Sequence, residues 1–252
     1  MNVKPVIAPL AVALVTAGAI TASAAGAFAA TPSPTTSAEP TTTSSHRSHL
    51  GKDATLQQIQ AAATSATGTR IGKLNAAITQ VNADKTLTSS DRSTLLSTLQ
   101  GDLAGMQQLQ AKIAADSTAS QARTDYTTIF RQYRVLAVAL PQERIVREAD
   151  RTTTTALPRL QAAEQKRSTQ LEKQQAKDTA TAKAALADLQ QQITAVQSKA
   201  QGLDAAALAV TPAQFNQSHS AITDVRSKAK ALRTAEKAAQ KDIHTIRQAL
   251  HG

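Results

Sequence analysis

Carboxylates and arginines crowd together near the middle of the chain. Glu143, Glu148 and Asp150 lie close in sequence to several arginines: Arg131, Arg134, Arg144, Arg147 and Arg151. Two such carboxylates could act as general acid and base if a cleft raised the pKa of one of them. The same residues could equally form ion pairs at helical spacings of three and four. No pocket signal accompanies them, so we favour the ion-pair interpretation.

No other stretch carries a catalytic signature. Serine-hydrolase, zinc-protease, phosphate-loop and dinucleotide motifs are absent from the sequence. Cysteine is also absent, which excludes thiolate metal sites and thiol nucleophiles. Glu236 occupies an apolar seam position, where we expect a cation from a facing helix to pair with it. The sequence therefore predicts a protein that is not an enzyme, with no catalytic residue, no cofactor and no metal.

A row of basic residues near the C-terminus is the clearest candidate binding surface. Its members are spaced four, three, four and four residues apart: Arg226, Lys230, Arg233, Lys237 and Lys241. That spacing holds them on one stripe of a helix. The stripe could contact a linear polyanion by releasing counterions. It could also be a solvated face, or pair with acidic residues of a neighbouring helix.

The whole chain is basic, with a formal net charge of +10. For an exported protein, the partner that this charge suggests is an anionic cell-wall polymer or another envelope protein. We expect no sequence-specific nucleic acid binding, because no nucleic-acid-binding motif occurs.

Helices must position all of these residues. Aromatic residues make up 2% of the chain, and apolar residues recur at spacings of three and four. One such seam comprises Leu186, Leu189, Ile193, Val196, Ala200, Leu203, Ala207 and Val210, and a second seam follows a heptad period from Ile222 to Leu250. Thr88 is the expected N-cap of a helix that ends near Ala115. The sequence predicts an all-α protein, an elongated antiparallel helical bundle or coiled coil of about six helices.

Most of the aromatic side chains gather in one short stretch, which we predict to be a structural hub. Tyr126, Phe130 and Tyr133 share one helix face, and Leu136 and Leu140 are spaced to continue it. Pro141 cannot donate a backbone hydrogen bond, so we expect a bend there. The hub thus predicted is Tyr126, Phe130, Tyr133, Leu136, Leu140 and Pro141.

The N-terminal part predicts export. Lys4 precedes an apolar stretch from Val6 to Ala22, and Ala27-Phe28-Ala29 fits a small-x-small cleavage site. The alternative is an uncleaved membrane anchor. We predict a signal peptide over residues 1–29, a disordered Thr/Ser/Pro-rich linker over 30–52 and a helical domain over 53–252. After cleavage no transmembrane helix is expected, and the protein would be secreted and extracellular, associated with the cell wall.

One segment resembles known proteins. IFRQYRVLAVALPQERIVREADR, from Ile129 to Arg151, resembles a segment shared by small secreted helical proteins of high-GC Gram-positive bacteria. The stretches from Arg70 to Leu99 and from Val210 to Leu232 are similar to other parts of the same proteins. The resemblance implies an exported helical fold and carries no assigned activity, cofactor or catalytic residue.

Two functions remain open at this point. The favoured one is a secreted, non-enzymatic helical protein, an envelope-associated structural or interaction module with a basic surface. The alternative is a small-molecule or metal-binding protein, or an enzyme, with its site between helices near the aromatic residues. A deep polar pocket with a buried Arg–carboxylate pair beside Tyr126 and Tyr133 would favour the alternative. A solid seam without such a pocket would favour the first.

Overall fold

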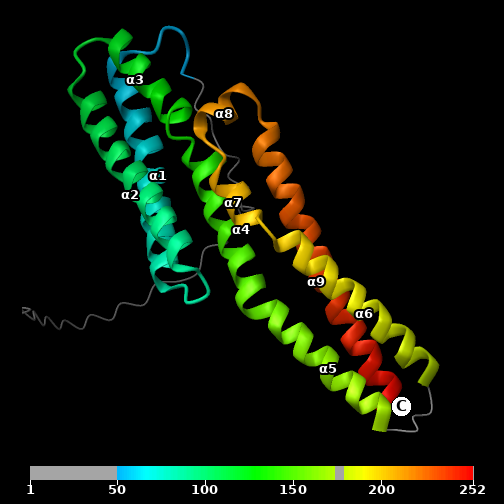
Figure 1. Ribbon diagram of the computed structural model, residues 1–252. Helices are drawn as coiled ribbons and strands as arrows, with labels where there is room; N and C mark the ends of the chain where they lie inside the picture. The colour runs from blue at the N-terminus through cyan, green and yellow to red at the C-terminus, as the bar shows by residue number, and fades with distance from the viewer. Residues whose placement is uncertain (1–49, 174–178, 252) are drawn as a thin grey trace, which may run out of the picture. The chain divides into compact units, whose positions relative to one another are not determined.

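The computed structural model describes residues 50–173 and 179–251. Every regular element in these ranges is a helix (Figure 1), which confirms the all-α class. The predicted signal peptide and residues 30–49 of the predicted linker lie outside the described residues. The elements are α1 (Leu56–Ala83), α2 (Ser89–Ala115), α3 (Ala119–Arg131), the π-helix η1 (Val135–Ala139), α4 (Leu140–Arg151), the π-helix η2 (Thr152–Ala156), α5 (Leu157–Lys173), α6 (Thr179–Ala200), α7 (Leu203–Leu208), α8 (Pro212–Gln217) and α9 (Ser220–His251).

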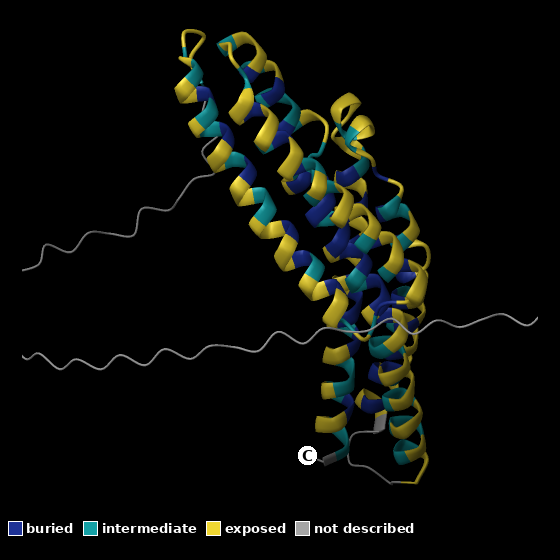
Figure 2. Ribbon diagram, turned by 90° about the vertical axis from the view of Figure 1, so that its left-hand side faces the viewer, coloured by how far each residue is buried: buried dark blue, intermediate teal, exposed yellow. Residues whose placement is uncertain are grey.

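The long helical segments of the described residues agree with the predicted number. They are α1, α2, α3, the continuous run from η1 to α5, α6 and α9. The short helices α7 and α8 lie between α6 and α9. Buried residues follow the sides on which the helices face one another, and exposed residues cover the outer sides (Figure 2).

The first three helices pack against one another. Thr55 caps α1 and Thr88 caps α2; each threonine side chain accepts a hydrogen bond from a backbone N–H of the first turn. The short turn between these helices makes them antiparallel neighbours, and α3 packs against both. Their shared core contains Ile59, Leu74, Leu99, Met106, Ile113 and Ile129, all at most 1% exposed.

Side chains from other elements satisfy the carbonyl groups at several helix C-termini. Gln60 donates to the carbonyls of Ile113, Ala114 and Asp116 at the end of α2. Gln142 does the same at the end of α7, where it donates to Ala207, Leu208 and Val210. The last carbonyls of a helix have no partner within the helix. These two glutamines therefore replace missing hydrogen bonds and tie α1 to α2 and α4 to α7.

The predicted bend at Pro141 is wrong. The chain breaks earlier, at Gln132–Arg134, where Arg134 adopts a left-handed conformation with φ of 46°. Pro141 instead lies in the first turn of α4, inside a continuous helical run. The break changes the helical phase, so Leu136 does not continue the face of Tyr126. Leu136 is 41% exposed and is not part of a buried hub, whereas Leu140 is buried.

The helix continues through Pro141 and Pro158, and each proline is the last residue of an Ala-Leu-Pro sequence at the end of a π-helix. Ala139-Leu140-Pro141 begins with the last residue of η1, and Ala156-Leu157-Pro158 begins with the last residue of η2. In both cases the leucine N–H donates to the carbonyl five residues back, the bond of a π-helix. We attribute the continuity to the wider turn, which gives the proline ring room beside the carbonyl four residues back.

The threonines of η2 reinforce this second π-helical turn. The hydroxyls of Thr152, Thr153 and Thr154 donate to the carbonyls of Glu148, Ala149 and Asp150. Such back-bonding bends helices and competes with the regular backbone ladder. The run of β-branched residues is therefore accommodated as a local π-helix within the continuous helix.

The longest helix pairing joins α6 and α9, which run side by side (Figure 1). Leu189, Val196, Ala229, Leu232 and Ala239 are fully buried in this pairing. The predicted seam to Val210 is buried too, except for half-buried Leu186, but its helix is interrupted. Gly202 has a φ of 68°, which glycine adopts at little cost, and it separates α6 from α7.

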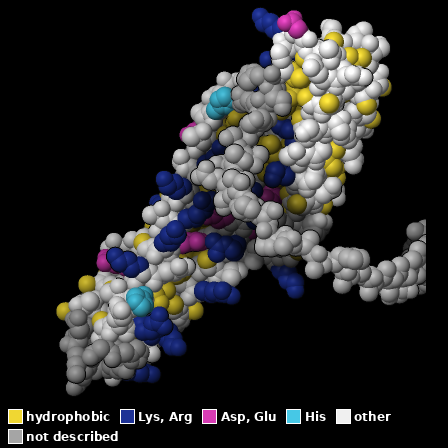
Figure 3. Space-filling model, turned by 180° about the vertical axis from the view of Figure 1, so that it is seen from behind, with side chains coloured by type: hydrophobic (Ala, Val, Ile, Leu, Met, Phe, Trp, Pro, Cys, Tyr) yellow, Lys and Arg dark blue, Asp and Glu magenta, His cyan; other side chains and the backbone are white. Residues whose placement is uncertain are grey.

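Basic side chains are unevenly distributed over the face of the molecule seen in Figure 3. Figure 3 shows many Lys and Arg side chains on the part formed by α4–α9 and few on the part formed by α1–α3. No helix among the described residues is both long and apolar enough to cross a bilayer.

Candidate functional site

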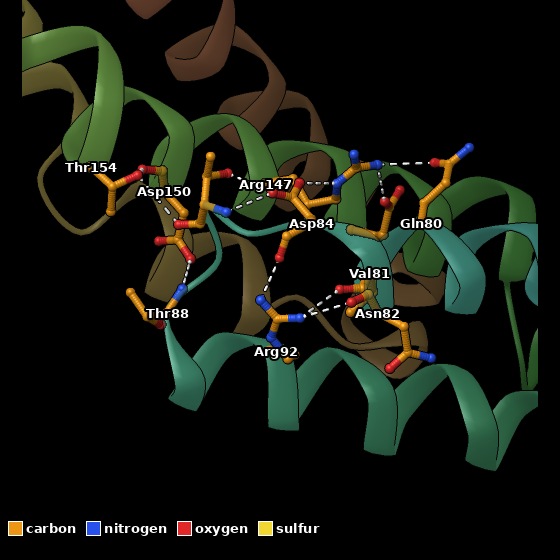
Figure 4. Close-up of polar contacts among 11 residues, drawn as sticks. Gln80, Val81, Asn82, Asp84, Thr88, Arg92, Arg147, Asp150 and Thr154 are labelled. Atoms are coloured by element: carbon orange, nitrogen blue, oxygen red, sulfur yellow. Dashed lines mark hydrogen bonds and ion pairs between the residues drawn. The ribbon is translucent and has the colours of Figure 1, made fainter. Parts of the chain in front are cut away.

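Arg147 joins α4 to the C-terminal end of α1 (Figure 4). Its Nε donates to Asp84 Oδ2 at 2.7 Å, and its Nη1 donates to Glu143 Oε1 at 2.8 Å and to Gln80 Oε1 at 2.9 Å. Burial alone would raise the pKa of Asp84, but hydrogen bonds from Arg147 and Thr86 outweigh it and lower the pKa to about 2. A carboxylate held ionised in this way cannot act as a general acid near neutral pH.

Two further ion pairs join α4 to α9. Arg233 donates to both carboxylate oxygens of Glu148, at 2.5 and 2.7 Å. Arg151 lies 3.1 Å from Glu236, whose other oxygen accepts the hydroxyl of Thr152 at 2.5 Å. Arg151 is thus the facing cation that the sequence predicted for Glu236. The predicted ion pairing at helical spacing is confirmed for Glu143, which pairs with Arg147 four residues later. Glu148 also pairs with an arginine, but its partner Arg233 lies on α9 and not within the same stretch.

Asp150, the third carboxylate singled out in the sequence, lies in a different environment. Its Oδ2 accepts the backbone N–H of Thr88 at 2.7 Å, so it helps to hold the start of α2 (Figure 4). Carboxylate oxygens of Asp91 and Asp204 lie near it, and the three groups offer oxygens within 4.8 Å of one another. Among the described residues, none of these three carboxylates forms an ion pair with Lys or Arg.

This acidic cluster of Asp91, Asp150 and Asp204 changes the titration of Asp150. Burial and repulsion by the other two carboxylates outweigh the hydrogen bond from Thr88 and raise the pKa of Asp150 to about 6. Carboxylate oxygens are ligands that Ca²⁺ and Mg²⁺ prefer, although Ca²⁺ takes roughly six to eight of them. The cluster is the one group of described residues that could hold a cation. Sequence reasoning missed it because its members come from three separate elements.

The aromatic residues pack α3 onto α1 and α2. Tyr126 and Phe130 meet edge to face with ring centroids 5.1 Å apart, and the guanidinium of Arg70 lies 4.6 Å from the Phe130 ring centre. Tyr133 lies directly against the backbone of Gly105 on α2. All three rings are only half-buried. Ile129, which the predicted hub did not include, is fully buried in this region.

Half-buried Arg147 and its buried partner Glu143 line neither of two grooves on the described surface. Neither groove is lined by Tyr126 or Tyr133, or by the other carboxylates of α4. One groove lies between α3 and α8, beside Arg131 and Asn216. Asn216 there accepts a hydrogen bond from Arg134, and Arg134 stacks over Phe215.

The five residues of the predicted stripe divide into two groups. All five are exposed on α9. Arg233 pairs with Glu148, and Arg226 donates to the carbonyl of Ala137, the group that a residue with an N–H in place of Pro141 would bond. Within the part of the chain that the structure describes, Lys230, Lys237 and Lys241 form no ion pair or side-chain hydrogen bond.

The second groove lies between α6 and α9, and Lys230 is on its wall. Its volume is about 590 Å³. Alanines of both helices line it, and Lys199 of α6 lies on the opposite wall from Lys230. Lys199 was not singled out from the sequence, because it lies on another helix and belongs to no basic run.

Comparison with known proteins adds no assignment to this geometry. No family model, no curated protein and no solved structure matches the chain. The function has to be inferred from the arrangement of the residues themselves.

Proposed function

We propose that this is a secreted, non-enzymatic helical protein that attaches to an anionic polymer of the cell envelope through Lys230, Lys237 and Lys241 on α9. The observation that carries the proposal is the exposure of these three ammonium groups in one row, with no ion pair to a carboxylate among the described residues. Seven residues of helix separate Lys230 from Lys237, about 10 Å along the axis. A linear polyanion can meet such a row at successive charges.

The remaining charges support this division of roles. Arg233, Arg151 and Arg147 hold α4 against its neighbours by pairing with carboxylates. Ammonium groups that have no such partner remain available to an external anion. Multiple contacts with a polyanion gain affinity by releasing counterions, and this gain falls as salt rises.

A binding assay with purified anionic cell-wall polymer tests the proposal. Binding should be clear at low salt and largely lost at high salt. Replacing the three lysines by glutamine should reduce the slope of log affinity against log salt by about 2, at roughly 0.7 per charge contact for a single-stranded polyanion. Circular dichroism should show unchanged helix content, because all three side chains are exposed.

A matched control distinguishes binding through the three α9 lysines from binding that depends only on the net charge of the protein. Lys73, Lys85 and Lys166 are also exposed, lie on other elements, and make no ion pair within the described part of the chain. Replacing these three by glutamine removes the same charge. If this control weakens binding as much as the α9 variant does, attachment depends on net charge and the proposed site is wrong.

Export is tested separately. Material recovered from the culture medium should begin at Ala30 on N-terminal sequencing. Protein that keeps Met1 and stays with the membrane would contradict the secreted part of the proposal.

A further inference from the structure

We propose that the groove between α6 and α9 seats the polymer, and that this polymer is a linear polyol phosphate whose phosphodiester groups lie between Lys199 and Lys230. This inference rests on the function proposed above and names the partner of the same surface. It is argued from the composition of the groove, from the lack of internal partners for most of its polar side chains, and from the chemistry of the phosphodiester.

The groove combines an apolar floor with charged walls. Alanine methyl groups line it from both helices, among them Ala195 on α6 and Ala231 on α9. Ala231 is exposed and Ala195 half-buried, so solvent reaches the floor. Lys199 stands on the α6 wall and Lys230 on the α9 wall. Apolar surface with a few converging polar groups is the usual composition of a binding site.

Of the polar side chains that line the groove, only Thr234 has a partner within the described residues, since its hydroxyl donates to the carbonyl of Lys230. The side chains of Lys199, Lys230, Gln192 and Ser227 make no hydrogen bond or ion pair in the part of the chain that the structure describes. This contrasts with Gln60 and Gln142, whose amides are used in capping helices. Two ammonium groups, an amide and a hydroxyl are therefore available to one ligand.

A phosphodiester chain fits this arrangement better than a polymer of sugar acids. In a phosphodiester the charge lies in the backbone, and its two free oxygens point to opposite sides, so each lysine can contact one oxygen. The carboxylate of a uronic acid projects from one side of its ring and reaches one wall only. The carbon atoms of the polyol can then lie on the alanines, and its hydroxyls can reach Gln192 and Ser227. Beyond the groove the same chain meets Lys237 and Lys241.

The test uses synthetic poly(glycerol phosphate) as the probe and polygalacturonate as the comparison. Two variants change the groove and leave the α9 row intact. Ala231→Leu fills the floor at an exposed position, and Lys199→Gln removes the charge of the α6 wall. Each should weaken binding of poly(glycerol phosphate) about two- to fivefold at low salt, the scale of one exposed charge contact. Binding of polygalacturonate should change less.

Matched controls lie on the same helix. Ala187→Leu and Lys183→Gln make the same chemical changes at exposed positions of α6 that do not line the groove. Both should bind poly(glycerol phosphate) as the unchanged protein does. With alanine methyl groups labelled for NMR, Ala195 and Ala231 should shift on titration with the probe, and Ala187 should not.

The outcomes separate the two proposals. If the α9 triple variant loses binding while Ala231→Leu and Lys199→Gln bind normally, attachment stands and the groove proposal is overturned. If polygalacturonate responds to the groove variants as strongly as poly(glycerol phosphate), the choice of a phosphodiester polymer is wrong. If the triple variant binds normally, or the unchanged protein binds neither polymer at low salt, both proposals fail.

Discussion

The guanidinium of Arg147 lies 2.8 Å from the carboxylate of Glu143, which is 2% exposed and lies one helical turn earlier on α4. The same guanidinium reaches Asp84 at the end of α1, so one arginine pairs with two carboxylates where α1 meets α4. This relationship predicts how the junction responds to loss of the cation.

Replacing Arg147 by methionine should destabilise the protein by about 3 kcal/mol. The reason is that Glu143 would remain buried without its cation, and an unpaired buried charge is costly. Adding Glu143→Gln to this variant should restore part of the loss, because the charge is then gone. Urea denaturation measures both effects.

The ion pair between Lys112 and Asp125 provides the comparison. The Lys112 side chain is 65% exposed and its charge is screened by solvent, so Lys112→Met should lower the stability much less than Arg147→Met does. Equal losses for Lys112→Met and Arg147→Met would contradict a special role for the α4 junction.

Asp150 should make the protein less stable as the pH rises from about 4 to 7. Its pKa is raised from 3.8 to about 6 by burial and by Asp91 and Asp204. The folded state therefore holds the proton more tightly than the unfolded state, and this stabilisation is lost as the pH rises through the folded pKa. Asp102 on α2 acts in the same direction, since burial raises its pKa to about 6 as well.

Asp150→Asn removes the cost of ionising this group and keeps an oxygen for the N–H of Thr88. At pH 7 the variant should be more stable by roughly 1–3 kcal/mol, from a pKa shift of about two units. At pH 4 the variant and the unchanged protein should have equal stability, and this comparison is the internal control. A loss of stability at pH 7 would mean that the negative charge of Asp150 is itself needed.

Ile129, the largest of the buried apolar side chains of α3, should contribute more to the stability of the hub region than the aromatic rings do. Ile129 is fully buried, so Ile129→Ala should cost about 2–5 kcal/mol. Phe130 is half-buried, and Phe130→Ala should cost about 1–2 kcal/mol, part of the value for a fully buried side chain. Thermal denaturation of the two variants measures both losses of stability. A larger loss for Phe130→Ala than for Ile129→Ala would contradict this prediction.

Gly105→Ala should displace the ring of Tyr133. A Cβ atom at position 105 would overlap the phenol ring, and the ring is only half-buried, so it can swing outward. The chain has two tyrosines and no tryptophan, so in a Tyr126→Phe background the fluorescence reports Tyr133 alone. Its accessibility to a soluble quencher should rise in the alanine variant. Unchanged quenching would show that the ring does not rest on Gly105.

Local features of the fold could be predicted from the sequence. The cap at Thr88, the end of α2 at Ala115 and the buried seam of α6 and α9 depend on neighbouring residues and on helical periodicity, which are visible in one stretch of chain. The Pro141 prediction failed because the π-helix of η1 accommodates the proline and the chain breaks at Arg134 instead. The repeated Ala-Leu-Pro sequence was the signal that could have indicated this.

The candidate sites were decided only by the tertiary structure. Periodicity shows which face of a helix is apolar, but it does not show which helix that face meets. The acidic cluster brings together Asp91, Asp150 and Asp204 from α2, α4 and α7. Lys199 meets the basic row of α9 across a groove that exists only because α6 and α9 pack together. The packing of α4 against α9 also determines which cations are paired. Arg233 forms an ion pair with Glu148 of α4, whereas Lys230, one turn earlier on α9, forms none within the described residues and can contact an external anion.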